Sequence, residues 1–385
     1  MNNTDHTIER AYRVRLRLKP AQERALSRLL GAKRFVWNWA LQRKDEAWRT
    51  AGISLSGVYL SRELTLLKKA PQTCWLSELS SVPLISLLRD FDQAWKNFFA
   101  GRAKRPRCKR YGSVMAARFT LDQRRTQVDR DAGTVQLDRI GKVRFRMTEP
   151  LIGRLRSVTI SRDSAGRWFA AFTADGVPLA PPVPAQHAAL GVDLGLKDTA
   201  ALSTGQIIRA PKYLAAKQAK LRRYQRSYCR QRDAALRRMG INPHKRIPKG
   251  TRIQVSGRMR RRQRQIGVLH ARIANARCNH QHQLTTHVVN TANVIAIEDL
   301  NVKAMSRSMR RSFRRSVSDA GLGEVRRQIT YKTTWCGRHL SIVDRLYPSS
   351  QLCSTKGCDY RHRHLQLKER QWQCPQCHTK HQRDT

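Results

Sequence analysis

Four cysteines near residue 360 place the strongest constraint on how this chain can fold. Cys353 and Cys358 form one pair, and Cys374 and Cys377 form a second pair after fifteen intervening residues. Two cysteine pairs on tight turns, separated by the length of a hairpin, supply the four thiolates of a tetrahedral zinc site. We therefore predict a zinc ribbon that holds a structural zinc ion. Four histidines lie close enough in sequence to replace one of these cysteines: His362, His364, His378 and His381.

The remaining five of the nine cysteines are scattered along the chain. An odd total with a single cluster is typical of reduced thiols and one metal site, and not of a disulfide framework. Residues 1–19 are polar and lack the pattern of a secretory signal, and the apolar runs are too short to span a bilayer. We expect a cytoplasmic protein without a membrane segment.

The charge balance identifies the class of partner. The chain has 76 Lys and Arg residues against 27 Asp and Glu residues, which gives a net charge of +49. A charge of this size opposes compaction by self-repulsion unless a polyanion neutralises it. Nucleic acid is such a polyanion, and the release of its condensed counterions favours binding. A solvated basic surface without a partner is the alternative that this composition leaves open.

Hydrophobic periodicity predicts a strand, then helices, then more strands in the first half of the chain. Residues 12–18 alternate as a half-buried strand does, and residues 20–101 carry apolar side chains at helical spacing. A basic connector at 102–111 follows. Beyond it, short alternating runs separated by turn residues are typical of an antiparallel barrel or sheet. These runs are 134–137, 142–147, 157–161 and 168–173.

The Pro-rich stretch 178–184 predicts a linker and a domain boundary. The period changes again after it, between short apolar runs and long arginine-rich segments. The predicted elements are a hairpin at 188–196 and 199–202, helices within 212–287, a buried strand at 292–297, a basic loop at 303–315, a helix at 325–339 and a strand at 341–346.

Three acidic residues occupy positions that favour chemistry. Asp193 lies inside an apolar strand in the motif Gly191-Val-Asp-Leu-Gly195, where a buried and unpaired carboxylate would be costly. Glu298 ends a fully apolar strand, the place where α/β sheets often carry functional groups. Asp384 follows the predicted ribbon. Taken singly, each has an ordinary alternative: a turn residue for Asp193, a cap for Glu298 or Asp299, and a solvated acid for Asp384.

Taken together, the three acids match one type of site. Hydrolysis of a phosphodiester by two Mg²⁺ ions requires a cluster of carboxylates that holds the metals roughly 3.5–4 Å apart. A hairpin-borne Asp193, a second-strand Glu298 and a late Asp384 fit an RNase H-like nuclease. We expect these three residues to be catalytic and to bind magnesium.

The ordered set of motifs closely resembles the TnpB family, whose members are transposon-encoded and similar to compact type V CRISPR effectors. The resemblance extends in outline to the whole chain. The motifs are Gly191-Val-Asp-Leu-Gly195, Ile297-Glu-Asp-Leu-Asn301, Tyr347-Pro-Ser-Ser350, the cysteine pairs of residues 353–377 and His381-Gln-Arg-Asp384.

The resemblance implies an α+β multidomain fold and a guided nuclease. A guide RNA derived from the transposon end would select double-stranded target DNA, and the protein would recognise a short adjacent motif. The implied organisation places a wedge-like β-barrel at 1–19 and 113–184, with a helical recognition domain inserted at 20–112. An RNase H-like (RuvC) domain follows at 185–346 and 381–385, with the zinc ribbon inserted at 347–380.

Two features depart from the family pattern. The first cysteine pair has a four-residue gap where the family usually has two residues, which should alter the turn without abolishing zinc binding. The sequence also ends at Thr385, where family members usually continue into a helix that anchors the last acid, so we expect Asp384 to lie on a fraying end. Two alternatives to a guided nuclease follow: an RNA-guided DNA binder or repressor with impaired cleavage, and a strand-transfer transposase that uses the same acids.

Two arginine-rich runs are the candidate phosphate contacts. For any single arginine, a solvated face without a specific contact is an equally good interpretation. Trp37, Trp39, Trp95 and Tyr111 could stack on bases, but core packing is favoured for the tryptophans because they lie within helical patterning. The arginines proposed to bind nucleic acid are Arg258, Arg260, Arg261, Arg262, Arg310, Arg311, Arg314 and Arg315.

Overall fold

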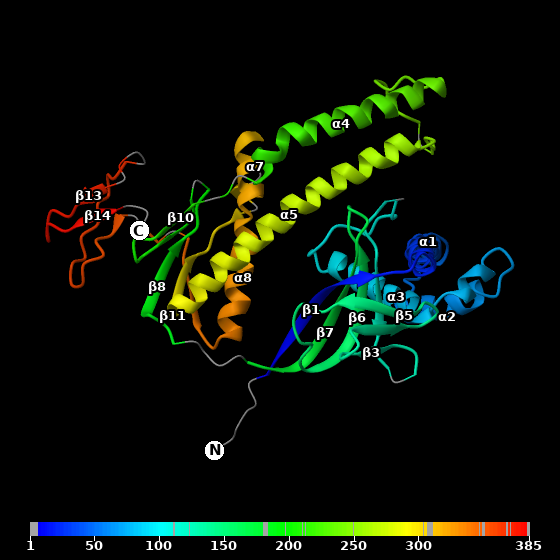
Figure 1. Ribbon diagram of the computed structural model, residues 1–385, viewed down its shortest axis with the longest axis horizontal. Helices are drawn as coiled ribbons and strands as arrows, with labels where there is room; N and C mark the ends of the chain where they lie inside the picture. The colour runs from blue at the N-terminus through cyan, green and yellow to red at the C-terminus, as the bar shows by residue number, and fades with distance from the viewer. Residues whose placement is uncertain are drawn as a thin grey trace, which may run out of the picture. The chain divides into compact units, whose positions relative to one another are not determined.

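The computed structural model divides the chain into two compact units, Met1–Pro178 and Leu179–Thr385 (Figure 1). It describes residues 7–110, 112–122, 124–179, 184–196, 198–209, 211, 213–248, 250–302, 304–305, 311–345, 347–348, 351–366, 369 and 371–382. The division falls where the Pro-rich stretch begins. None of the described helices is long and apolar enough to cross a membrane.

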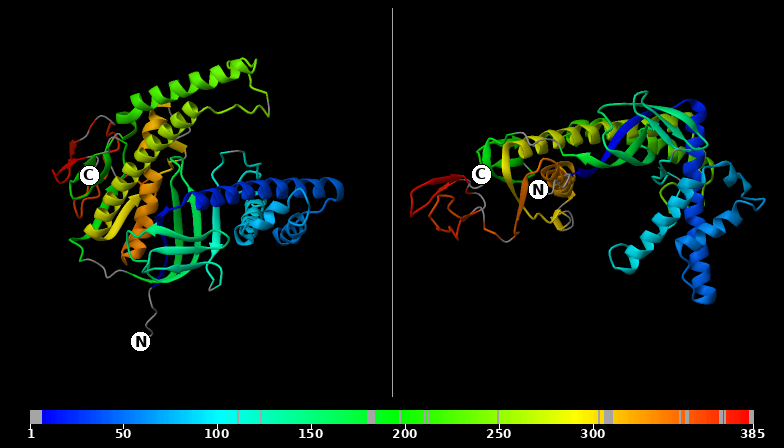
Figure 2. Two further views of the ribbon diagram at one scale, coloured as in Figure 1. Left: turned by 45° about the vertical axis from the view of Figure 1, so that its right-hand side comes forward. Right: turned by 90° about the horizontal axis from the view of Figure 1, so that it is seen from below.

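The first unit contains a curled seven-stranded sheet (Figure 2). The strands are ordered β2-β6-β7-β1-β5-β4-β3, and every pair is antiparallel. On β1, the side chains of Tyr12, Val14 and Leu16 are buried, and the arginines between them are exposed. The strands are β1 (Thr7–Arg17), β2 (Ala116–Thr120), β3 (Gln127–Asp129), β4 (Thr134–Leu137), β5 (Gly141–Arg146), β6 (Arg154–Arg162) and β7 (Trp168–Pro178).

Helices inserted between β1 and β2 share the core of this sheet. They are α1 (Pro20–Ala51), α2 (Gly57–Leu67), the 3₁₀ helix Cys74–Glu78 and α3 (Ser81–Phe99). Pro20 opens α1 where no helical N–H partner is required, and Gly52 ends it with a left-handed φ of 66°. Helices α2 and α3 approach closely at Gly57, where a Cβ atom would lie 2.8 Å from the backbone oxygen of Leu88.

The tryptophans of this unit pack in the core. Trp37 and Trp95 are each 7% exposed, and the Trp37 ring meets Phe91 edge to face with 5.1 Å between centroids. Trp39 is partly buried against the same core. The prediction of core packing is therefore confirmed for these three residues, and Tyr111 lies outside the described residues.

The second unit is built on a mixed five-stranded sheet with the order β10-β9-β8-β11-β12. The first three strands form antiparallel pairs, and β11 runs parallel to both β8 and β12. The strands are β8 (His187–Asp193), β9 (Asp198–Leu202), β10 (Ile207–Arg209), β11 (Ala292–Glu298) and β12 (His339–Val343). The helices are α4 (Tyr213–Arg238), α5 (Gly257–Thr291), α7 (Arg311–Ala320) and α8 (Leu322–Trp335).

One face of this sheet is covered by α5 and α8. Their apolar side chains form a common core with the buried residues of the strands. Helices α4 and α5 also pack against each other and extend as a helical arm (Figure 1). The small antiparallel pair β13 (Gln371–Gln373) and β14 (Lys380–Gln382) belongs to the cysteine-rich segment.

The predicted α+β composition is confirmed, together with the hairpin before residue 203 and the helices within 212–287. The prediction of a loop at 303–315 is wrong at residues 304–305, which are helical, and again from Arg311 onward, where α7 begins. Val317 of α7 is buried, four residues after the partly exposed Phe313. Apolar residues at helical spacing therefore outweighed the basic composition on which the loop prediction rested.

Candidate functional site

Asp193 and Glu298 end two neighbouring parallel strands of the second unit. The pairing of β8 with β11 sets Val192 opposite Ile297, so the next positions along the two strands are Asp193 and Glu298. Adjacent strands lie about 4.8 Å apart. The sheet thus brings together two carboxylates that are more than a hundred residues apart in the sequence.

The two acids share the face of the sheet that α5 and α8 leave uncovered. Val192 and Ile297 are 4% and 1% exposed and lie in the core with these helices. Because successive side chains point to opposite faces of a strand, Asp193 and Glu298 point away from that core. Asp193 is exposed and Glu298 is half-buried. Water and ions can therefore reach this edge of the sheet.

Asp299, the next acid in the chain, has a different environment. Its carboxylate pairs with Arg326 of α8 and with Arg345, whose Nη2 lies 2.9 Å from Oδ2. The hydrogen bond from Arg326 is the largest cause of a lowered pKa for this carboxyl. Arg345 Nε also donates to the Asp299 carbonyl oxygen at 3.0 Å. Asp299 thus ties the end of β11 to α8 and to the segment after β12.

The turn after Asp193 requires a glycine. A Cβ atom on Gly195 would lie 2.8 Å from the backbone oxygen of Asp198, inside van der Waals contact. Gly191 is less restricted, since its Cβ would meet Ser203 at 3.5 Å. Its backbone instead makes two hydrogen bonds with Ser203, one of them from Gly191 N to Ser203 Oγ at 3.0 Å. These contacts fix the position of Asp193 between β9 and β11.

Asp384, the third predicted acid, lies outside the described residues. The chain is described as far as β14, which contains His381. Of the three predicted acids, the structure therefore brings Asp193 and Glu298 together.

The four predicted zinc ligands converge. The Sγ atoms of Cys353, Cys358, Cys374 and Cys377 all lie within 4.8 Å of one another. The separations are 3.4 Å between Cys353 and Cys377 and 3.7 Å between Cys358 and Cys374, well beyond the length of a disulfide bond. Tetrahedral zinc with bonds of about 2.3 Å places its sulfurs nearly this far apart. The cluster is compatible with a structural zinc ion.

Tight turns and hydroxyl groups support the cluster. Gly357 has a left-handed φ of 80° in the first turn, and His378 has a φ of 54° in the second. Hydrogen bonds between the Cys377 sulfur and the hydroxyls of Thr355 and Thr379, each 3.4 Å long, lower the pKa of this thiol to about 5. Four crowded thiolates would repel one another, so a bound cation is needed for all four to ionise together.

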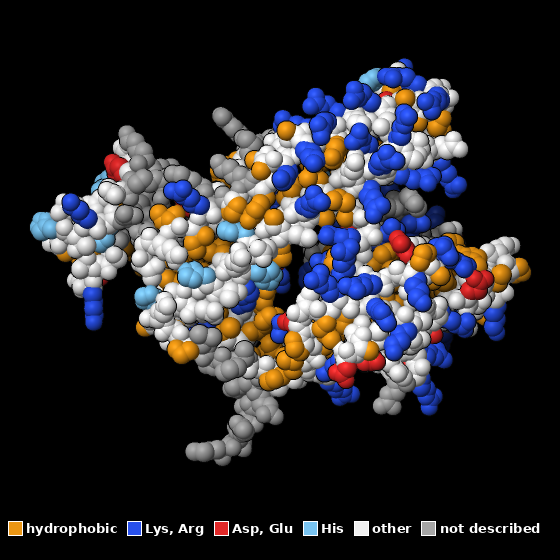
Figure 3. All heavy atoms as spheres, viewed as in Figure 1, with side chains coloured by type: hydrophobic (Ala, Val, Ile, Leu, Met, Phe, Trp, Pro, Cys, Tyr) orange, Lys and Arg blue, Asp and Glu red, His pale blue; other side chains and the backbone are white. Residues whose placement is uncertain are grey.

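The helical arm is strongly basic. Helix α4 has nine Lys and Arg residues with one Asp, and α5 has seven Arg residues with no acid. Figure 3 shows Lys and Arg side chains distributed over this arm. Arg258, Arg260 and Arg261, which are candidates for phosphate contacts, are exposed. Arg262 instead packs toward α4, with its guanidinium 5.3 Å from the centre of the Tyr224 ring.

A basic groove of about 290 Å³ lies between α4 and α5. Tyr224 contributes an aromatic ring, and several cations surround it. The sequence interpretation missed the contribution of α4, although Lys220 and Tyr224 show the i, i+4 spacing of one helix face. The groove is lined by Lys220, Tyr224, Arg261, Arg264 and Arg272, with Gln265, Val268 and Leu269.

The second basic run is described only in part. Arg310 lies outside the described residues, and the side chains of Arg311 and Arg315 are not described although their backbone belongs to α7. Arg314 is exposed on α7. This run therefore lies partly on a helix.

The sheet of the first unit carries a second basic surface. Arg15 lies directly opposite Arg146, and Arg17 opposite Arg144, where β1 pairs with β5. Within the described residues, none of these four exposed arginines forms an ion pair. Arg13 extends the surface, with its guanidinium 4.0 Å from the centre of the Phe169 ring. Like charges directly across a strand pair destabilise a sheet, so this face favours an anionic partner.

Family models match most of the chain. A model described as "Probable transposase" matches residues 163–309, and one described as "Cas12f1-like, TNB domain" matches residues 323–385. A third, described as "Helix-turn-helix domain", matches residues 7–52. In the structure this last segment forms β1 and one continuous helix, α1, in place of two helices joined by a turn.

Curated relatives align over nearly the full length. The chain is 33% identical over 380 residues to a protein of Streptomyces pristinaespiralis named "Putative RNA-guided DNA endonuclease", covering 98% of this chain and 87% of the relative. It is 29% identical over 377 residues to "Putative RNA-guided DNA endonuclease InsQ" of Escherichia coli K12, covering 94% and 87%.

Solved structures share the fold at low sequence identity. The chain resembles the protein in a cryo-EM structure of a Cas12f1-sgRNA-target DNA complex with a TM-score of 0.51 and 12% identity, over 97% of each chain. It resembles the mini-RNA-guided endonuclease CRISPR-Cas phi3 with a TM-score of 0.50 and 9% identity, over 98% of this chain and 91% of that one.

The opposed arginines of β1 and β5 give a test of the electrostatic interpretation. In the absence of nucleic acid at low salt, Arg146→Gln should stabilise the protein by about 0.2–1 kcal/mol because one like-charge pair is removed. The same change should weaken binding to duplex DNA. It should also reduce the slope of log affinity against log salt concentration by about one, as expected for the loss of one phosphate contact. Urea denaturation and fluorescence anisotropy at several salt concentrations measure the two effects.

The matched control is Arg62→Gln, on the exposed surface of α2. This change should leave low-salt stability within experimental error. If Arg146→Gln behaves like the control in both assays, the β1–β5 arginines are neither in electrostatic conflict nor in contact with phosphate.

Proposed function

Because the chain belongs to the TnpB family of transposon-associated proteins, with relatives named as RNA-guided DNA endonucleases, we propose that it cuts DNA under the direction of a guide RNA. The guide would derive from the transposon end, and the cut would fall in double-stranded DNA that matches the guide beside a short motif. The reaction would be a Mg²⁺-dependent hydrolysis of the phosphodiester in a RuvC-like site. One observation carries the proposal most strongly: Asp193 and Glu298 lie side by side at the ends of parallel strands.

The donor set fits magnesium. Mg²⁺ prefers carboxylate oxygens and keeps several water molecules, which suits two acids at an accessible sheet edge. In the proposed site Asp193 and Glu298 would hold the metal together with Asp384. Bound divalent ions would supply a nucleophilic water and Lewis-acid stabilisation of the leaving oxygen. The protein residues would orient the phosphate, and Asp299 with its two arginines would keep Glu298 in register with Asp193.

Basic surfaces would hold the nucleic acids. The groove between α4 and α5 and the arginine face of β1 and β5 would neutralise phosphates of the guide and its target. Base pairing would then select the sequence, while the protein would read duplex shape and a short motif. In this scheme the wedge-like barrel at 1–19 and 113–184 and the recognition helices at 20–112 correspond to the first unit, except that the proposed barrel extends six residues past Pro178, where that unit ends. The second comprises the nuclease domain at 185–346 and 381–385 and the zinc ribbon at 347–380.

The acid pair yields the most direct test of the nuclease site. Asp193→Ala or Glu298→Ala should reduce guided cleavage by at least about a hundredfold, since each removes a metal ligand. RNA and DNA binding should stay within about twofold, because the basic surfaces are untouched. Cleavage of matching duplex DNA with Mg²⁺ and gel-shift affinities measure the two quantities.

Asp198→Ala is the matched control, because Asp198 starts the neighbouring strand of the same hairpin and is half-buried. It should keep the wild-type cleavage rate. If Asp193→Ala cuts as fast as the control, the catalytic assignment is wrong. Guided binding by the wild-type protein without any cleavage would instead support an RNA-guided repressor.

The match to a model described as "Probable transposase" keeps strand transfer as a second candidate function. Transfer of transposon-end DNA in the absence of guide RNA distinguishes the two reactions. Such transfer, lost in Asp193→Ala, would replace the proposal of a guided endonuclease.

The cysteine cluster allows a test of zinc binding. We expect one zinc ion per chain, and Cys374→Ser with Cys377→Ser should remove it because half of the thiolate ligands are lost. Elemental analysis of the purified protein gives the stoichiometry, and proteolysis should then cut first within residues 347–382. Exposed Cys229 and Cys278, replaced together by serine, are the control pair. Zinc retained at full stoichiometry in the cluster variant would exclude this site.

A further inference from the structure

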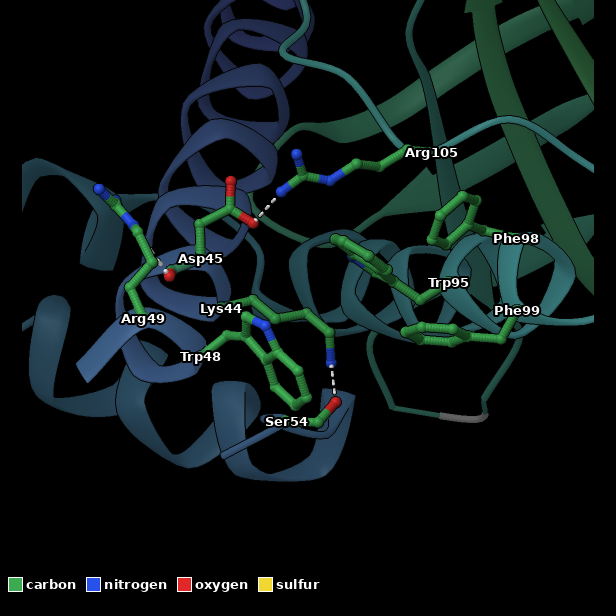
Figure 4. Close-up of a pocket in the computed structure, with 9 residues that line it drawn as sticks. All are labelled: Lys44, Asp45, Trp48, Arg49, Ser54, Trp95, Phe98, Phe99 and Arg105. Atoms are coloured by element: carbon green, nitrogen blue, oxygen red, sulfur yellow. Dashed lines mark hydrogen bonds and ion pairs between the residues drawn. The ribbon is translucent and has the colours of Figure 1, made fainter. Parts of the chain in front are cut away.

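A pocket of about 660 Å³ opens on the helical part of the first unit, and its lining includes none of the residues assigned above to catalysis, metal binding or phosphate contact (Figure 4). Its walls come from the end of α1, the segment after it, the end of α3 and the basic connector that follows. Trp48 and Phe99 reach it from α1 and α3, and Trp95 lies between them in Figure 4.

The aromatic side chains of this pocket are unusually exposed. Trp48 is 63% exposed and Phe99 is 69% exposed, whereas Trp95 beneath them is 7% exposed. The rings of Trp95 and Phe99 are stacked, with centroids 5.7 Å apart and planes 29° from parallel. Large aromatic faces left in water are typical of a binding surface, because their burial against a partner is favourable. The buried indole N–H of Trp95 also has no acceptor among the described residues.

Positive charge surrounds the aromatic rings. Lys44 Nζ lies 5.4 Å from the centre of the Trp95 ring and donates to Ser54 Oγ at 2.9 Å. Arg105 pairs with Asp45 at 2.6 Å. Arg49 donates through Nε to the Asp45 carbonyl oxygen at 3.2 Å. The pocket walls thus carry three cations against one carboxylate, and Asp45 is already shared with Arg105.

A basic segment leads away from the pocket along α1. Trp37 Nε1 donates to the Arg107 carbonyl oxygen at 3.0 Å, and the side chain of Asn38 makes two hydrogen bonds with the Lys109 backbone, at 2.7 and 3.1 Å. These bonds hold the backbone of the connector in place. The side chains left exposed along it include Arg102, Lys104, Arg107 and Arg110.

The exposed aromatic rings and the cations around them together indicate which class of partner suits the pocket. A second copy of this chain would bring another net charge of +49 against an already basic surface, which is unfavourable. A nucleic-acid strand offers the complementary charge, and every nucleobase has a face that stacks on aromatic rings. We propose that the pocket binds an unpaired nucleobase of a single strand, with adjoining phosphates along the connector.

Trp48 and Phe99 would stack on the base, and Arg49 and the connector would contact the flanking phosphates. The inference rests on the proposed binding of nucleic acid and not on cleavage. It applies to RNA and to DNA alike, since both carry bases and phosphates.

Two short single-stranded oligonucleotides serve as probes, each with a single 2-aminopurine. The DNA probe carries it among thymidines, and the RNA probe carries it among uridines. The protein is freed of nucleic acid at high salt and assayed without Mg²⁺. Trp48→Ala and Phe99→Ala should each weaken binding about tenfold and relieve quenching of the 2-aminopurine. Trp48→Phe should restore most of the affinity. Whichever sugar form shows the larger loss identifies the natural strand.

The matched control replaces Val58 and Leu66 by alanine, since these side chains of α2 are 69% and 67% exposed in the same unit. The control should bind like the wild type, and all variants should bind fully paired duplex equally. Wild-type affinity and quenching in the Trp48→Ala, Phe99→Ala double variant would overturn the proposal. If sedimentation shows that the double variant has lost self-association while its probe binding is unchanged, the pocket binds a second copy of the chain instead. Neither outcome bears on whether the protein is a nuclease, because the assay contains no target DNA and no Mg²⁺.

Discussion

The parallel pairing of β8 with β11 is the contact on which the rest of the second unit depends. It sets Asp193 beside Glu298 and buries Val192 and Ile297 against α5 and α8. Two parallel strands require a long crossover, and here the crossover contains the basic helical arm. The same pairing therefore creates the candidate acidic site and the insertion that carries the basic groove between α4 and α5. A shift of one residue in this register would turn Glu298 toward the helix-covered face.

Uncompensated positive charge is the second constraint. Opposed arginines on β1 and β5, the groove between α4 and α5, and the rim of the aromatic pocket all lack enough carboxylates to balance them. Each arrangement raises the free energy of the isolated protein and is relieved by a bound polyanion. A bound anionic partner would therefore stabilise this fold.

The sequence predicted the elements and the convergence of the four cysteines better than it predicted the surfaces. Strand β1 and helices α1 and α3 followed from periodicity, because each buries one regular face. The cysteines were predictable since their spacing matches a known coordination geometry. Glu298 was chosen over Asp299 because it ends the apolar strand, but the ion pairs of Asp299 with Arg326 and Arg345 were not predictable, because these arginines are distant in sequence. Cross-strand arginines and the Trp48–Phe99 pocket likewise arise only from tertiary pairing. Helix α7 was missed because its basic composition masked its apolar spacing.

We propose that a bound RNA directs this protein to cut DNA. The most direct measurement is to identify the RNA that co-purifies with it, replace the guide segment of that RNA, and offer two DNA duplexes with Mg²⁺, one matching each guide. We expect cleavage to follow the guide, so that each complex cuts only its own matching duplex. Cutting that stays at one DNA sequence whichever guide is bound, or that proceeds without RNA, would contradict it.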